Sequence, residues 1–172
     1  FIIVANHSSH VDTAALLGVL PFLKVHKVFP VAAKDYFGKN FITKTFFKLT
    51  MNTLLIERKC SKQKADSISV MVDALDKGNS LIIFPEGSRV LDEGLQKFKS
   101  GVIRVLSQRP EVVFIPAYVK NSSRILPKGD PFVVPHNFKM AIGQAYKIDP
   151  SKSDEENLSY IRNKVIEVGE LI

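Results

Sequence analysis

Two short polar segments of this sequence contain side chains suited to acid–base or phosphate chemistry. The first is Asn6-His7-Ser8-Ser9-His10-Val11-Asp12. A neutral imidazole accepts a proton near pH 7, and a carboxylate bonded to its other ring nitrogen fixes the tautomer and the ring orientation. If His7 lies in a loop and Asp12 in the first turn of a helix, the chain can fold the carboxylate back onto the ring. Taken alone, this pair is a weak signal, and a capping loop with an exposed histidine is the plainer interpretation.

The second polar segment is Phe84-Pro85-Glu86-Gly87-Ser88-Arg89, which follows an apolar run. Gly87 permits a close approach of the backbone to a ligand and unusual dihedral angles. Arg89 offers two parallel donors to a phosphate, and Glu86 could bind an acceptor hydroxyl or a nearby cation. The alternative is an ordinary turn that carries a surface ion pair.

A third segment, Ile56-Glu57-Arg58, would bring another arginine to the end of a strand. A phosphate could bind there, although a solvated charge pair is by itself the better interpretation.

A metal site is less favoured than acid–base chemistry. His7, His10 and Asp12 could be ligands in a metallohydrolase, but such a site needs further ligands from elsewhere. His10 is better explained as the first exposed residue of a helix. Cys60 is the single cysteine, so a disulfide within the chain and a zinc site built on several thiolates are excluded. Its polar surroundings indicate a surface residue rather than a nucleophile.

The elements that must position these segments alternate between strand and helix. Because the predicted strands are uniformly apolar, they should be buried on both faces, which favours an α/β sandwich with three layers. Its central sheet should be mixed but largely parallel and flanked by helices. We expect one domain over residues 1–172, trimmed from or part of a longer chain. The predicted strands are 1–5, 27–33, 52–57, 80–84, 112–119, 132–134 and 139–142, and the predicted helices are 10–20, 38–49, 61–77, 100–107 and 153–168.

The composition is that of a folded domain with a basic surface. Hydrophobic residues make up 45% of the 172 residues, and the formal net charge is +7. Such a surface attracts phosphates on lipid headgroups, coenzyme A or nucleic acid, and it also attracts an acidic carrier protein. Charge alone does not choose among these partners, and nucleic acid has only the charge in its favour.

Taken together, the segments resemble the glycerolipid acyltransferases, which include 1-acylglycerol-3-phosphate and glycerol-3-phosphate acyltransferases. Four blocks of that family occur in order, and the resemblance covers nearly the whole chain. The resemblance rests on His7 and Asp12 with four residues between them, on 56–58, on 84–89, and on Phe114-Ile115-Pro116-Ala117. The stretch Phe98-Lys99-Ser100-Gly101 also matches.

The resemblance implies a mechanism and a set of substrates. His7 would be the general base that deprotonates the acceptor hydroxyl, and Asp12 would orient and polarise it. The hydroxyl would then attack the thioester directly, without a covalent enzyme intermediate. The donor would be acyl-CoA or an acyl carrier protein as co-substrate, with no metal and no other cofactor. The acceptor would be a lysophospholipid, with 1-acylglycerol-3-phosphate first and glycerol-3-phosphate or another lysolipid as alternatives.

The resemblance also implies acceptor-binding positions. Arg58 and Arg89 would contact phosphate. Glu86 and Gly87 would position the acceptor, and Pro116 would shape the pocket floor. Ser88 stands where threonine is common in the family, and it keeps the hydroxyl. The full set is Arg58, Glu86, Gly87, Ser88, Arg89 and Pro116.

Two rival functions remain open from the residues. One is an acyl thioesterase or metal-dependent hydrolase that uses the same His7 and Asp12. The other is a non-catalytic lipid- or acyl-carrier-binding domain. For location, we expect a soluble cytoplasmic domain or peripheral binding at the cytoplasmic face of an anionic membrane. The basic, phenylalanine-bearing stretch 36–47 could supply a membrane face, although a core-packing helix is the plainer explanation.

Overall fold

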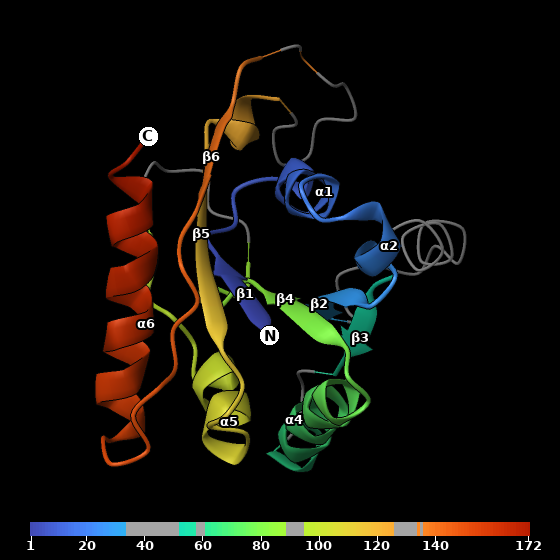
Figure 1. Ribbon diagram of the computed structural model, residues 1–172, viewed down its shortest axis with the longest axis vertical. Coiled ribbons are helices and arrows are strands. Elements are labelled where there is room, and N and C mark those ends of the chain that lie inside the picture. Colours follow the sequence, from blue (N-terminus) through green and yellow to red (C-terminus); the bar gives the residue numbers. More distant parts are fainter. Residues whose placement is uncertain (34–51, 58–60, 89–94, 126–133, 135) are drawn as a thin grey trace.

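The computed structural model describes residues 1–33, 52–57, 61–88, 95–125, 134 and 136–172. These residues form a six-stranded sheet in the order β3-β2-β4-β1-β5-β6 (Figure 1). All neighbouring strands run parallel except β5 and β6, which are antiparallel. The prediction of a mixed, largely parallel sheet is therefore confirmed. The strands are β1 (Ile2–Ala5), β2 (Val28–Ala33), β3 (Leu54–Ile56), β4 (Ser80–Ile83), β5 (Phe114–Lys120) and β6 (Lys139–Ile142).

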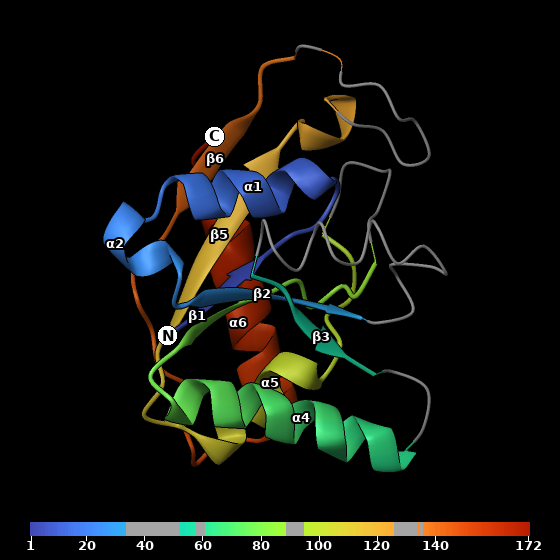
Figure 2. The ribbon, with the colours of Figure 1, turned by 90° about the vertical axis from the view of Figure 1, so that its right-hand side faces the viewer.

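Helices cover both faces of this sheet (Figures 1 and 2). One face packs against α4, α5 and α6, and the other packs against α1. The short helix α2 and the 3-10 turn η2 lie in connections. The helices are α1 (His10–Gly18), α2 (Phe22–Val25), α4 (Ser61–Asp76), α5 (Gly101–Gln108) and α6 (Asp154–Gly169), and η2 spans Ser122–Arg124.

The two layers of helices explain why the central strand β1 is apolar throughout. Successive side chains of a strand point to opposite faces. Ile2 and Val4 accordingly belong to the core beneath α4, α5 and α6, whereas Ile3 and Ala5 belong to the smaller core beneath α1. All four residues of β1 are buried. The centre of the sheet is thus buried, and the polar segments lie at the ends of its strands.

Most predicted elements are present, with ends that differ by at most two residues. Ser9 caps α1 and Ser153 caps α6, each through a capping box. The short helix α2 was not predicted. The predicted helix 38–49 lies outside the described residues, as does the predicted strand 132–134 except for Val134, which is not in a strand. Among the described helices, none combines the length and apolar character needed to cross a bilayer.

Pro116 lies inside the sheet, at an irregularity in the strand pairing. β5 lies inside the sheet, between β1 and β6. Its pairing with β1 is continuous from Phe114 to Ala117. On the β6 side, the Pro116 carbonyl accepts from Gly143 at 2.8 Å, whereas Phe114 pairs with Tyr146, a shift of one residue. The missing N–H of proline falls at this shift, where no ladder donor is required.

Candidate active site

The candidate site is built at the carboxyl ends of β1 and β4, which are parallel neighbours. Parallel strands end at the same edge of a sheet, so the residues that follow them meet there. His7 follows β1 and Phe84 follows β4. Their rings stack with centroids 4.2 Å apart and planes 21° apart. The two polar segments that the sequence separates by more than seventy residues are therefore in contact.

The His7 ring is oriented by the buried carboxylate of Asp12. Oδ2 of Asp12 lies 3.0 Å from Nδ1 of His7 and accepts from the backbone N–H groups of Ser8 and Ser9, each at 2.8 Å. Asp12 is fully buried, whereas the His7 side chain is 16% exposed. The carboxylate thus folds back onto the ring as expected from the spacing.

This contact determines which ring nitrogen is available. An ionised carboxylate can only accept a hydrogen bond, so Nδ1 of His7 carries the proton towards Asp12. In the neutral imidazole, Nε2 then has a free lone pair. This is the arrangement that a histidine needs in order to remove a proton from a bound hydroxyl.

Asn6 fixes the end of β1 on which His7 stands. Its side-chain amide donates to the carbonyl of Val119 at 2.8 Å, and its side-chain oxygen accepts from the Val119 N–H at 2.7 Å. The pair is buried and joins β1 to β5. Sequence reasoning assigned no role to Asn6, although its position between a buried strand and His7 was a signal for one.

Glu86 joins the loop that carries His7 to the segment that contains Gln96. It is 5% exposed. Oε1 accepts from the backbone N–H of His7 at 3.0 Å, and Oε2 accepts from the backbone N–H of Gln96 at 3.2 Å. Burial raises the pKa of the Glu86 carboxyl, and the hydrogen bonds from His7 and Gln96 only partly offset that rise. We expected Glu86 to position the acceptor, but in the structure its two oxygens bond the backbone of the protein itself.

Gly87 adopts the backbone conformation for which glycine was expected. Its φ is +75°, in the left-handed region that side chains disfavour. Its N–H donates to the carbonyl of Phe84 at 3.0 Å and closes the turn. Ser88 follows on the exposed surface. Arg58 and Arg89, the two expected phosphate ligands, lie outside the described residues.

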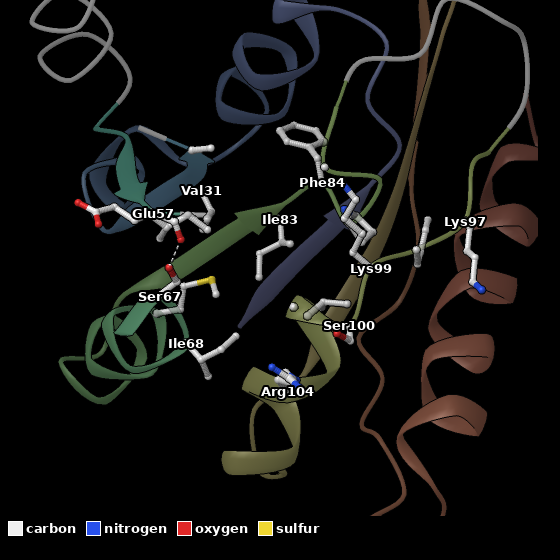
Figure 3. A pocket seen from close by; sticks show the side chains of 18 residues that line it. Val31, Glu57, Ser67, Ile68, Ile83, Phe84, Lys97, Lys99, Ser100 and Arg104 are labelled. Carbon is white, nitrogen blue, oxygen red and sulfur yellow. Dashed lines mark hydrogen bonds between the residues drawn. The ribbon is translucent and has the colours of Figure 1, made fainter. Parts of the chain in front are cut away.

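A cavity of about 730 Å³ opens beside this turn (Figure 3). Phe84, Pro85 and Gly87 line it on the side of the turn. Pro116 does not line this cavity, because it is buried in β5, where its ring faces Gly143. The apolar floor includes Val31, Ile56, Ile68, Met71, Ile83 and Phe98, and the charged side chains of the lining are Glu57, Lys97, Lys99 and Arg104.

The part of the chain that the structure describes contains no cluster of side chains suited to bind a metal ion. No group of three or more His, Cys, Asp and Glu side chains lies close enough there to hold an ion. His10 begins α1, as expected. Cys60 lies outside the described residues.

Comparison with known proteins assigns the family. The family model described as Acyltransferase matches residues 1–120, which include the loop that carries His7, the 84–88 turn and β5. That match covers well over half of the chain. The chain belongs to the Acyltransferase family.

Individual relatives agree with this assignment. A probable 1-acyl-sn-glycerol-3-phosphate acyltransferase of Mycoplasma pneumoniae is 33% identical over 107 residues, which is 60% of this chain and 38% of the relative. The chloroplastic 1-acyl-sn-glycerol-3-phosphate acyltransferase LPAT1 of Arabidopsis thaliana is 26% identical over 152 residues, which is 88% of this chain and 40% of the relative. This chain therefore spans about two fifths of the length of these curated relatives.

A solved structure confirms the fold. The crystal structure of the 1-acyl-sn-glycerophosphate acyltransferase PlsC from Thermotoga maritima matches with a TM-score of 0.76 over 99% of this chain and 66% of that one. The sequences are 23% identical. At that identity the likeness establishes the α/β architecture, with its mixed sheet between helices.

Proposed function

We propose that this chain is the catalytic domain of an O-acyltransferase of phospholipid biosynthesis. It would move a fatty acyl group from a thioester donor to the hydroxyl of a lysophospholipid, first among them 1-acylglycerol-3-phosphate. The observation that carries the proposal is the His7–Asp12 contact at the end of β1, inside the segment that matches the family model.

The proposed reaction is a direct transfer. Nε2 of His7 takes the proton from the acceptor hydroxyl as its oxygen forms a bond to the thioester carbonyl carbon. The tetrahedral intermediate collapses and breaks the carbon–sulfur bond. The thiolate leaves with the proton that His7 had taken, which regenerates the neutral imidazole. Asp12 stabilises the imidazolium between these two steps. The donor thioester and the acceptor hydroxyl account for every bond and proton in this reaction, so no metal or other cofactor is proposed.

The substrates follow from the cavity and the relatives. An apolar floor with a cationic edge suits a molecule that has both an acyl chain and a phosphate. Two relatives are named for 1-acyl-sn-glycerol-3-phosphate, which supports that acceptor. The donor is acyl-CoA or an acyl carrier protein. Arg58 and Arg89 are proposed to contact the acceptor phosphate, and Ser88 is proposed to lie beside it.

Access to a lipid substrate requires a membrane or micelle surface. A formal net charge of +7 favours attraction to anionic lipids, at about 1 kcal/mol for each lysine or arginine near the surface. We propose peripheral binding at the cytoplasmic face of such a membrane.

The test is release of free thiol from palmitoyl-CoA, with and without lysophosphatidate, in the presence of a metal chelator. The proposal expects release that depends on acceptor, resists the chelator and disappears in His7→Ala. Release without acceptor would identify a thioesterase, and release abolished by the chelator would identify a metal-dependent hydrolase. A folded His7→Ala protein with unchanged turnover would exclude the general-base mechanism.

A further inference from the structure

The side chain of Lys99 lies directly against the backbone of Gly87. A Cβ atom at Gly87 would stand 2.6 Å from Nζ of Lys99, 3.0 Å from Cδ and 3.1 Å from Cε. Real Cβ atoms do not approach other atoms that closely, so the lysine occupies space that only glycine leaves free. The sequence suggested that Gly87 lets a ligand approach the backbone, and the structure shows that Lys99 approaches it.

The backbone holds Lys99 in this place. Its N–H donates to the carbonyl of Pro85 at 2.8 Å. Three positions earlier, the N–H of Gln96 donates to Oε2 of Glu86 at 3.2 Å. The segment that carries the lysine is thus tied at two points to the turn that follows β4, and through Glu86 to the backbone of His7.

Among the residues that the structure describes, no ion pair or hydrogen bond engages Nζ of Lys99, which lines the cavity. The charged residues that line the cavity there are three cations and one acid, so an anion is the favoured occupant. Figure 3 shows Lys99 reaching towards Phe84, whereas Lys97 points away from the other labelled side chains. Phe84 lines the cavity and stacks on the His7 ring, so it connects the side of the cavity that holds Lys99 to the proposed base.

We propose that Lys99 and the turn at Gly87 form an anion site that binds a phosphate group of a substrate next to His7. This inference rests on the proposed function and deepens it, because it adds a phosphate ligand to the arginines expected from the family resemblance. The phosphate belongs either to the lysophospholipid acceptor or to the coenzyme A donor. Gly87 contributes by leaving room for the ammonium group.

The first test is steady-state kinetics of Lys99→Met, which keeps the aliphatic stem and removes the charge. Loss of a charge-assisted hydrogen bond should raise the KM for the phosphate-bearing substrate by about ten- to a hundredfold. Lys99→Arg keeps the positive charge, so its KM for the phosphate-bearing substrate should lie much closer to that of the wild type. Lys147→Met, at an exposed position outside the cavity lining, is the matched control and should match the wild type.

Paired substrates identify the source of the phosphate. If the acceptor supplies it, Lys99→Met raises the KM for lysophosphatidate and leaves that for 1-acylglycerol unchanged. If the donor supplies it, the KM for palmitoyl-CoA rises, and that for the palmitoyl thioester of N-acetylcysteamine, which lacks phosphate, does not. Equal changes for both members of each pair, or no change in any KM, would overturn the proposal.

A second variant tests the pairing with glycine. Gly87→Ala should displace the ammonium group and raise the same KM that Lys99→Met raises. The double variant should then bind the phosphate-bearing substrate no more weakly than Lys99→Met alone, because the two changes remove one contact. Additive losses in a double variant that still folds would contradict the shared site.

Calorimetric binding separates this proposal from the proposed function. Titration with glycerol-3-phosphate and with coenzyme A requires no turnover. A protein that transfers no acyl group, yet binds one of these ligands only when Lys99 is present, would keep the anion site and lose the acyltransferase proposal. Equal binding by wild type and Lys99→Met would remove the anion site, whatever the activity.

Discussion

The backbone N–H of His7 donates to Oε1 of Glu86 at 3.0 Å across 79 positions of sequence. The other oxygen of the same carboxylate accepts from Gln96. One buried side chain therefore holds the loop that carries the proposed base and the segment that carries Lys99. This relationship gives Glu86 a positioning role, which differs from the acceptor-binding role expected from the family resemblance.

Glu86→Gln should lower kcat about ten- to a hundredfold with little change in the KM for acceptor. The amide NH2 of glutamine would face one of the two backbone donors and release either His7 or Gln96, at a cost of about 1–3 kcal/mol. An acceptor ligand would instead show its loss in KM. Hydrogen–deuterium exchange at residues 5–9 and 95–99 should rise in the variant, and Glu111→Gln at an exposed site is the control. Unchanged exchange with a raised KM would favour the acceptor-binding role.

Glu86 should also make stability depend on pH. Its folded-state pKa is raised above the ordinary value of 4.5, so at pH values between these two pKa values the folded protein holds a proton that the unfolded chain has released. Stability should therefore decline as the pH rises from 4.5 through the folded-state pKa. Glu86→Gln should remove that part of the decline, as measured by urea unfolding between pH 4 and 8. A decline of equal size in the variant would assign it to other groups.

Asp12→Asn should lower kcat at least about a hundredfold while leaving the KM for acceptor nearly unchanged. Asparagine keeps an oxygen for the Ser8 and Ser9 amides, but its neutral amide cannot stabilise the imidazolium of His7. The other carboxylate oxygen, Oδ1, is buried without a hydrogen-bond partner among the described residues, so an NH2 group there would also lower Tm. Full activity in a folded variant would show that Asp12 serves only to cap α1.

Arg58→Ala should mainly raise the KM for a phosphate-bearing acceptor, by about tenfold or more. Arg58 follows Glu57, which lines the cavity. The measurement compares lysophosphatidate with 1-acylglycerol. An equal loss for both acceptors would contradict a phosphate contact.

Two glycine substitutions should affect stability in opposite directions. Gly143→Ala would place a Cβ 2.7 Å from Cγ2 of Val168 and 2.9 Å from Cγ of Pro116, and such overpacking costs about 1–3 kcal/mol. Gly18→Ala meets no atom within 4 Å and should add up to about 1 kcal/mol at the end of α1. Urea unfolding of both proteins checks the prediction, which fails if Gly143→Ala is as stable as the wild type.

Local pattern was sufficient for most of the fold. The apolar runs at β1 and β4 are buried on both faces, and this alone indicated a parallel sheet between helices. Ile68, Val72 and Leu75 recur at helical spacing, and the face of α4 that carries them lies in the core. The short α2 was missed because four residues are too few to show a period.

The sequence by itself determined the elements and the polar strand ends, and it made the His7–Asp12 contact possible, because each depends on residues close together in the chain. Only the tertiary structure decided what surrounds that contact. Pairing of β1 with β4 and β5 brought Phe84 onto His7 and Val119 onto Asn6. It also turned Glu86 towards the protein backbone and laid Lys99 over Gly87. These partners lie far apart in the sequence, so only the order and register of the strands could bring them together.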